Sequence, residues 1–229
     1  QSKLYEAVRA TMQASIQKIV AEKGFKRSQI QILDALLKLR QVCCHPSLLK
    51  LDSVKSGQAH SAKLEQLMDM VVPMVEEGRK ILIFSQFTSM LELIEQQLHH
   101  AEIGYVKLTG KTKKRDEVIT AFQSGQVPVF LISLKAGGVG LNLTTADTVI
   151  HYDPWWNPAA EDQASDRAWR IGQDKPVFVY KLITNKSIEE KILALQQNKA
   201  ELAHSILSTD HEGEAKLTEN DVMNLFEKF

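Results

Sequence analysis

Short apolar runs alternating with amphipathic segments are the feature that most constrains the fold of this 229-residue chain. Strands that alternate with helices of about 10 to 15 residues are typical of βαβ units, in which helices cover a mostly parallel sheet. Two runs, ILIF at 81–84 and VFLI at 129–132, are apolar at every position, as expected of strands buried on both faces. The expected strands are 80–85, 105–108, 127–133, 148–152 and 177–182, with helices at 63–77, 90–100 and 113–123. The sequence therefore predicts an α/β fold whose mostly parallel sheet is sandwiched by helices.

Helical additions are expected at both ends of this region. Apolar residues at three-to-four spacing predict helices over 3–22 and 28–42. The polar segment 52–60 has no periodicity and reads as a boundary loop. A capping-box pattern at Ser187 opens a final helix that extends to 207. We expect a helical lead-in over 1–59, an α/β domain over 60–207, and a polar tail over 208–229 that holds a short docking helix.

Composition limits the classes of function. The 28 basic and 28 acidic residues cancel, so nucleic-acid binding has to be argued from local residues. The only cysteines, Cys43 and Cys44, are adjacent; they form no disulfide framework and, with His45, lack the spacing of a zinc site. No apolar run approaches membrane-span length and no secretory leader opens the chain, so we expect an intracellular protein without a membrane partner. The first residue is Gln1 rather than Met, which suggests a piece of a longer protein.

Ligands of open parallel sheets bind beyond the carboxyl ends of the strands, so the loops there are the candidate sites. The loop after Ser133 has three glycines within 137–140, which allows a close backbone approach to phosphate, although such a cluster is more often a tight turn. The string Gly110-Lys111-Thr112 is not a P-loop, because the position five residues before Gly110 is Tyr105 and not glycine. No strand here ends in an Asp-Glu pair that would hold magnesium. This chain alone is therefore not expected to bind Mg-ATP in the ordinary way.

The segment 163–173, QASDRAWRIGQ, is the most suggestive one. Arg167 and Arg170 are three residues apart and would share one face of a helix, with Gln163 one turn earlier. Paired guanidinium groups suit phosphate oxygens, and an arginine supplied by a second domain can stabilise the transition state of phosphoryl transfer. Spacing alone leaves an alternative open, in which both are surface arginines paired with acidic residues of 161–166.

Three ordered stretches, at 81–88, 133–158 and 163–173, resemble the motifs of one family. ILIFSQFT, SLKAGGVGLNLTTADTVIHYDPWWNP and QASDRAWRIGQ are similar to parts of the second RecA-like lobe of Snf-type ATPases. Within them, ILIFSQF corresponds to helicase motif IV, SLKAGGVGLNL at 133–143 to motif V and QASDRAWRIGQ to motif VI. These are DNA translocases and chromatin remodellers of helicase superfamily two. The resemblance covers about residues 30–207, because RQVCCHPSLL at 40–49 is similar to the helical lead-in of that lobe. It is especially similar to bacterial and archaeal members, except that Trp169 stands where the family commonly has His.

The resemblance implies a site shared between two lobes. ATP and Mg²⁺ would be held mainly by an N-terminal RecA-like lobe of the same polypeptide. This lobe would supply Arg167 and Arg170 as arginine fingers, with Gln163 positioning them and with Gly138 and Gly140 lining the cleft. Six residues would contact double-stranded DNA through its phosphates, without reading its sequence: Ser85, Gln86, Thr109, Gly110, Ser133 and Lys135.

The function so implied is that of the second motor lobe of a DNA-dependent ATPase that translocates on double-stranded DNA and is inactive without its first lobe. A monomer in the cytoplasm, associated with the nucleoid if prokaryotic, is expected. The alternative is a non-catalytic nucleic-acid or protein binding module; an RNA helicase lobe is disfavoured by the Trp-Trp-Asn-Pro stretch at 155–158. Trp155 and Trp156 either brace the motif V loop or stack on a base, and the basic residues of 111–115 either start a solvated helix or attract DNA phosphates.

Overall fold

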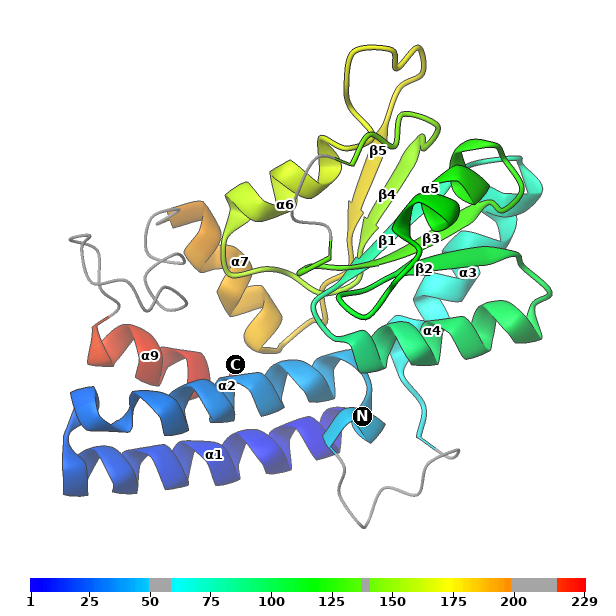
Figure 1. Cartoon of the computed structure of the whole chain (residues 1–229). Helices are drawn as coiled ribbons and strands as arrows, with labels where there is room; N and C mark the ends of the chain where they lie inside the picture. The colour runs from blue at the N-terminus through cyan, green and yellow to red at the C-terminus, as the bar shows by residue number, and fades with distance from the viewer. Residues whose placement is uncertain (50–58, 137–140, 199–217) are drawn as a thin grey trace. The chain divides into compact units, whose positions relative to one another are not determined.

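The computed structural model describes residues 1–49, 59–136, 141–198 and 218–229 (Figure 1). The chain forms two compact units. A helical unit comprises 1–62, 156–158 and 184–229, and a sheet unit comprises 63–155 and 159–183. The residues after 184 thus belong with the N-terminal helices by their contacts, whereas the boundaries expected at 59/60 and 207/208 stay a prediction.

The sheet unit has five strands, and all neighbouring strands are parallel. In chain order they are β1 (Ile81–Ser85), β2 (Tyr105–Leu108), β3 (Val129–Ser133), β4 (Thr148–His151) and β5 (Phe178–Lys181). Their order across the sheet is β2-β3-β1-β4-β5. Ser85 lies beside Ser133 in the register of β1 and β3, so the loops that follow these strands begin at one edge. The predicted parallel sheet is confirmed.

Helices cover both faces of this sheet (Figure 1). They are α3 (Ala62–Glu76), α4 (Thr88–His100), α5 (Arg115–Gln123) and α6 (Pro158–Ser165). Alternate strand residues such as Phe84 and Ile132 pack in one cluster with Phe122 of α5 and Ala164 of α6. The intervening residues, such as Ile83, are equally buried and point to the opposite face, because successive side chains of a strand alternate. There α4 contacts β1 and β3, so the predicted sandwich is confirmed.

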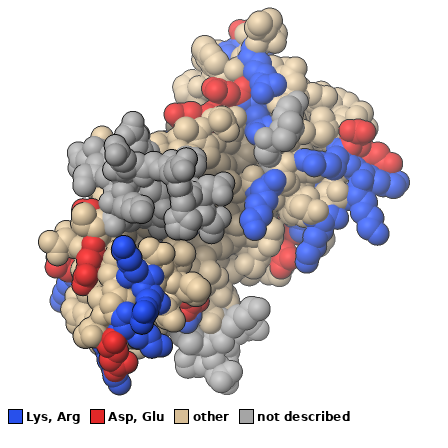
Figure 2. Space-filling model, turned by 60° about the vertical axis from the view of Figure 1, so that its left-hand side comes forward, with Lys and Arg blue, Asp and Glu red and all other residues tan. Residues whose placement is uncertain are grey.

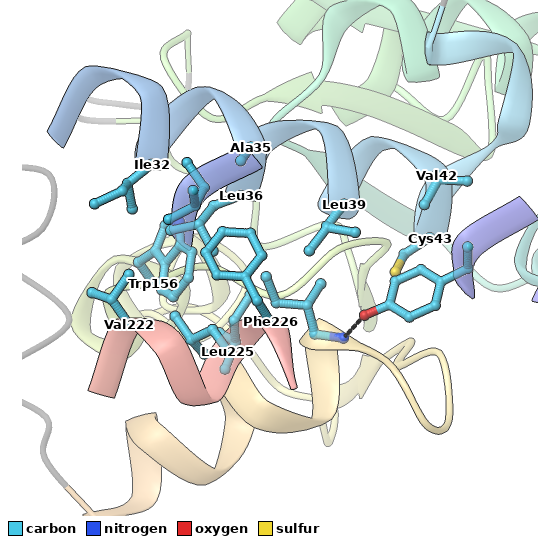
Figure 3. Close-up of a cluster of buried hydrophobic side chains, with 14 residues drawn as sticks. Ile32, Ala35, Leu36, Leu39, Val42, Cys43, Trp156, Val222, Leu225 and Phe226 are labelled. Carbon is cyan, nitrogen blue, oxygen red and sulfur yellow. Dashed lines mark hydrogen bonds between the residues drawn. The ribbon is translucent and has the colours of Figure 1, made fainter. Parts of the chain in front are cut away.

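The described part of the helical unit contains α1 (Ser2–Lys23), α2 (Gln29–Cys44), α7 (Ile188–Asn198) and α9 (Glu219–Phe226), with short 3-10 turns at Phe25–Ser28 and Pro46–Leu49. Gly24 ends α1 at φ 78°, a conformation that glycine adopts without steric cost. Figure 3 shows the core of this unit, in which Leu36 and Leu39 of α2 meet Trp156 and Phe226. The helix predicted in the tail is α9.

Buried polar contacts fasten the helices of this unit to one another. The Tyr5 hydroxyl accepts a hydrogen bond of 2.7 Å from the Ile188 backbone N–H, at the start of α7 (Figure 3). The Arg9 guanidinium donates to the Phe226 carbonyl at 2.6 Å, at the end of α9. Residues 199–207 of the predicted final helix and most of the predicted loop 52–60 lie outside the described residues. Within the described ranges, no helix combines the length and apolar character needed to cross a bilayer.

Candidate functional site

The candidate site is built at the carboxyl edge of the sheet, where an aspartate joins two loops. Ser85, the last residue of β1, donates from Oγ to Asp153 Oδ1 at 2.5 Å. The Gln86 backbone N–H donates to the other carboxylate oxygen at 3.1 Å, and the Gln86 side chain donates to the Pro154 carbonyl at 3.3 Å. Ser85 is fully buried, so its hydroxyl orients the two loops and is not presented at the surface. Sequence reasoning missed Asp153, although an acidic residue directly after a buried strand was a usable signal.

The loop after β4 is braced by a second buried carboxylate. Glu161 on α6 is 1% exposed, and its Oε1 accepts a hydrogen bond of 2.7 Å from the Trp155 backbone N–H. The other oxygen lies 2.6 Å from Lys181 Nζ at the end of β5. The Trp155 ring packs edge-on against Phe84 and His151. Trp155 therefore braces the loop from inside the core.

The neighbouring tryptophan has the same kind of role in the helical unit. Trp156 is buried in the core of that unit, with the Arg40 guanidinium 5.5 Å from its ring centre. Of the two interpretations open at the sequence level, bracing fits the buried positions of both rings, because a ring in a core has no face left for a base.

The helix expected to carry both arginines ends early. α6 stops at Ser165, and the Ala168 N–H bonds the Ser165 carbonyl three residues back. The Arg167 carbonyl instead accepts a hydrogen bond of 2.9 Å from the Leu143 N–H. The prediction that Arg167 and Arg170 share a helical face is therefore wrong, because this contact takes the carbonyl that would continue the helix. Arg167 is 7% exposed, whereas Arg170 is exposed.

Gln173 holds the segment that follows α6. Its Nε2 lies within hydrogen-bond distance of three backbone carbonyls, those of Thr144 at 2.9 Å, Ala146 at 2.8 Å and Ala168 at 2.9 Å. The Gln173 side chain thus ties the segment that carries the arginines to the residues that directly follow the motif V sequence at 133–143. Gln173 closes the motif at 163–173, but nothing in the sequence indicates this bracing role.

Arg167 is the most unusual side chain of the site. Its Nε and Nη1 are buried and have no hydrogen-bond partner among the residues that the structure describes. Burial, and to a lesser extent the nearby charge of Arg170, lowers the pKa of the Arg167 guanidinium. Removing a charge from water without pairing it is costly, so this group is electrostatically suited to receive an anion.

A small pocket of about 110 Å³ adjoins this guanidinium. Gln163, which is exposed on α6, lies in its wall together with Arg167, so the structure brings these two predicted site residues to one place. The remainder of the wall is apolar apart from backbone groups. The complete lining is Phe84, Leu134, Trp155, Ala160, Gln163, Ala164 and Arg167.

The predicted DNA contacts lie in the loops after β1, β2 and β3. Thr109 is half-buried, and its N–H donates to Thr112 Oγ1 at 2.9 Å, while Gly110 is exposed. Ser133 is buried and Lys135 is exposed. Gly138 and Gly140, the predicted cleft residues, lie outside the described residues.

Basic residues gather around these loops. Arg115 Nη2 donates to the Ala136 carbonyl at 2.6 Å, which ties the start of α5 to the loop after β3. Three exposed lysines closely precede Arg115 in the chain: Lys111, Lys113 and Lys114. Figure 2 shows Lys and Arg side chains grouped at the right-hand side of that view. No group of three potential cation ligands occurs within the described ranges, and the polar side chains of the pocket itself suit anionic phosphate oxygens.

This fold and this site define the C-terminal lobe of a helicase-type ATPase. Residues 62–172 match the family of the helicase conserved C-terminal domain. The solved C-terminal domain of the Sulfolobus solfataricus SWI2/SNF2 ATPase is 34% identical, with a TM-score of 0.75 over 100% of this chain and 93% of that one. The ATPase core of the same protein in complex with double-stranded DNA is 33% identical, with a TM-score of 0.78 over 98% of this chain and 48% of that one. The chain belongs to the SWI2/SNF2 ATPase family.

Curated relatives come from bacteria and from eukaryotes. The putative ATP-dependent helicase/translocase YwqA of Bacillus subtilis is 36% identical over 92% of this chain and 23% of its own length. The ISWI chromatin-remodeling complex ATPase ISW1 of Saccharomyces cerevisiae is 35% identical over 90% of this chain and 19% of its own length. The chain thus spans about a fifth of the length of these relatives.

Proposed function

We propose that this domain is the second motor lobe of a DNA-dependent ATPase that translocates on double-stranded DNA. ATP and Mg²⁺ are held mainly by an N-terminal RecA-like lobe of the same polypeptide, and this lobe adds Arg167 and Arg170 as fingers. Gln163 positions these fingers, and Gly138 and Gly140 line the nucleotide cleft. The names of the relatives, ATP-dependent helicases and a core solved with double-stranded DNA, support this assignment.

The single observation that carries the proposal is the guanidinium of Arg167 beside a pocket, with Nε and Nη1 buried and without a hydrogen-bond partner among the described residues. In water the attraction between a guanidinium and a phosphate is weak, because water screens both charges. In a desolvated site the same attraction is much stronger. The fixed loop spares the reorganisation that such a contact otherwise requires. Arg170, exposed three residues later, adds a second positive charge for the transferring phosphoryl group.

DNA is contacted through its backbone by the loops at the carboxyl edge. Gln86, Thr109, Gly110 and Lys135 supply amides, a hydroxyl and one cation, which hold phosphates without reading base sequence. Ser133 adds a second hydroxyl, which is buried but, unlike that of Ser85, has no hydrogen-bond partner among the described residues. Ser85 acts by positioning Gln86 through Asp153, because its hydroxyl is already bonded. Attraction by Lys111 and Lys113 adds a salt-dependent component. The intact enzyme is expected to be a monomer. It is expected in the cytoplasm, associated with the nucleoid if the source is prokaryotic.

The test uses a protein that carries this lobe together with its N-terminal lobe, and it measures DNA-stimulated ATP hydrolysis. Arg170→Ala and Arg167→Ala are each expected to lower kcat by about 10³-fold or more. Lys175→Ala, at an exposed cation of the same segment, is the matched control and is expected to keep the wild-type rate. Arg167→Ala also removes a buried unpaired charge, so its melting temperature is expected to be at least that of wild type.

Three outcomes would change this conclusion. If hydrolysis survives Arg170→Ala, the assignment of Arg170 as a finger fails. If the 229-residue chain hydrolyses ATP alone, the site is not shared between lobes. If the folded two-lobe wild type hydrolyses no ATP with DNA present, the alternative of a non-catalytic binding module replaces the motor.

A further inference from the structure

The two large apolar side chains on either side of Arg170 in the chain are exposed to solvent. Trp169 is 64% exposed and Ile171 is 102% exposed. The fold buries its other tryptophans, Trp155 and Trp156, almost completely. Scattered exposed apolar residues are ordinary, but an exposed tryptophan directly beside an arginine brings together two residue types that are enriched in interface hot spots. We call Trp169 and Ile171 the apolar pair.

The apolar pair is presented by a constrained segment. Figure 1 shows the connection between α6 and β5, in yellow, standing out beyond the ends of the strands. At its base the Gln173 amide bonds the carbonyls of Thr144, Ala146 and Ala168, and the Arg167 carbonyl bonds the Leu143 N–H. Side chains on a segment held in this way lose less conformational entropy when a partner covers them, so they bind more effectively than the same residues on a free loop.

We propose that the apolar pair docks on the N-terminal RecA-like lobe of the same polypeptide when the two lobes close on ATP. The inference rests on the proposed function. The match to the solved Sulfolobus solfataricus ATPase core covers 48% of that core, so the core holds a further part of comparable size beside the part that this chain matches. Trp169 and Ile171 flank Arg170 in the chain and all three are exposed, so a lobe that this finger reaches also comes within reach of the apolar pair.

Docking would give the apolar pair a role in the reaction. Covering Trp169 and Ile171 favours the closed form of the enzyme, because apolar surface leaves water. The same contact excludes water from around Arg170, and a guanidinium acts more strongly on phosphate oxygens when it is desolvated. Trp169 and Ile171 are thus positioning residues that act through closure, whereas Arg167 and Arg170 act on the nucleotide.

The test follows Trp169 fluorescence in the two-lobe protein, taken as the difference spectrum between wild type and Trp169→Phe. The probe is ADP with beryllium fluoride in the presence of duplex DNA. We expect the Trp169 emission to shift to shorter wavelength when the probe binds, because the ring leaves water. Ile171→Ser is expected to reduce this shift and to raise the KM for ATP by about tenfold or more, whereas the matched control Ile171→Val keeps both near wild type.

The possible results separate this inference from the proposed function. If Arg170→Ala abolishes hydrolysis but Trp169→Ala and Ile171→Ser leave KM and kcat unchanged, the motor stands and the docking inference is overturned. Quenching of Trp169 without a shift, seen with ATP but not with a triphosphate that lacks a base, would assign Trp169 to base stacking and also overturn it. If the two-lobe wild type hydrolyses no ATP, the proposed function fails and the inference fails with it.

Discussion

Ser85 Oγ and Asp153 Oδ1 lie 2.5 Å apart at the carboxyl edge of the sheet, and both residues are buried. The Asp153 carboxylate also accepts from the Gln86 N–H at 3.1 Å, so one side chain joins the loops after β1 and β4. These loops hold Gln86 and Trp155 beside the candidate site.

Replacing Asp153 with alanine is expected to lower the free energy of unfolding by about 2 to 3 kcal/mol, because the Ser85 hydroxyl and the Gln86 N–H both lose a buried acceptor. Urea unfolding of the 229-residue chain measures this change. Asp162→Ala, at an exposed acidic residue of α6, is the control and should change stability by less than about 0.5 kcal/mol. Equal stability of both variants would show that the Asp153 carboxylate does not hold these loops.

His151 gives the protein a pH-dependent stability. Burial lowers the pKa of His151 to about 4 in the folded chain; the Glu161 carboxylate opposes this shift, and the Lys181 ammonium adds a smaller lowering effect. Its Nε2 lies 3.0 Å from Ser165 Oγ, and its ring stacks on Phe84. The folded state therefore keeps this imidazole neutral at pH values at which the unfolded chain protonates it.

Above about pH 6.5 both states hold a neutral His151, so this residue adds no pH dependence there. As the pH falls from about 6.5 to about 4, only the unfolded state gains the proton, and stability falls by about 3 kcal/mol in total. Urea unfolding at a series of pH values should show this loss in wild type and a flatter profile in His151→Gln. His100→Gln, at an exposed histidine that ends α4, should keep the wild-type slope; identical slopes for His151→Gln and wild type would contradict the assignment.

Gln173→Glu tests the brace beneath the arginine segment. The change replaces an amide donor with a carboxylate that faces three carbonyl oxygens, yet it keeps the oxygen that accepts from the Lys175 N–H at 3.1 Å. We expect a loss of about 2 to 3 kcal/mol in unfolding free energy and faster hydrogen exchange at the Leu143 amide, which bonds the Arg167 carbonyl.

The matched control for this brace is Gln123→Glu. Gln123 Nε2 donates a single exposed hydrogen bond, to the Asn142 carbonyl at 2.6 Å, so its loss should cost much less. If both glutamate variants had the same stability and the same Leu143 exchange rate, Gln173 would not be holding the segment.

The elements of the fold could largely be predicted from the sequence. The strand expected at 105–108 has those bounds, and the helices expected at 3–22 and 113–123 are α1 and α5 within about two residues. The order of the strands across the sheet, unlike their positions in the chain, could not be predicted from the sequence. β3 lies between β2 and β1, an order that depends on how helices pack on both faces and not on any run of residues.

For the candidate site, the sequence indicated which residues take part, whereas only the structure shows how they are arranged. The sequence singled out Arg167, Arg170 and Gln163 because guanidinium groups at that spacing, within a motif, favour phosphate chemistry. It placed both arginines on one helix, since nothing local marks Ser165 as the end of α6. Only the folded chain brings Leu143 to the Arg167 carbonyl, ends the helix there and leaves one guanidinium buried and the other exposed.

The sequence by itself thus determined the apolar runs, the helical periods and the residue types that can bind phosphate. The runs and periods follow from the demand that apolar side chains leave water, and the phosphate-binding residue types follow from the permanent charge and planar donors of the guanidinium group. The tertiary structure decided which carbonyl accepts from which distant N–H, and which charged groups are desolvated. Those outcomes depend on packing between segments far apart in the chain, so the partners of Asp153 and Gln173 and the exposure of the apolar pair became visible only in the folded protein.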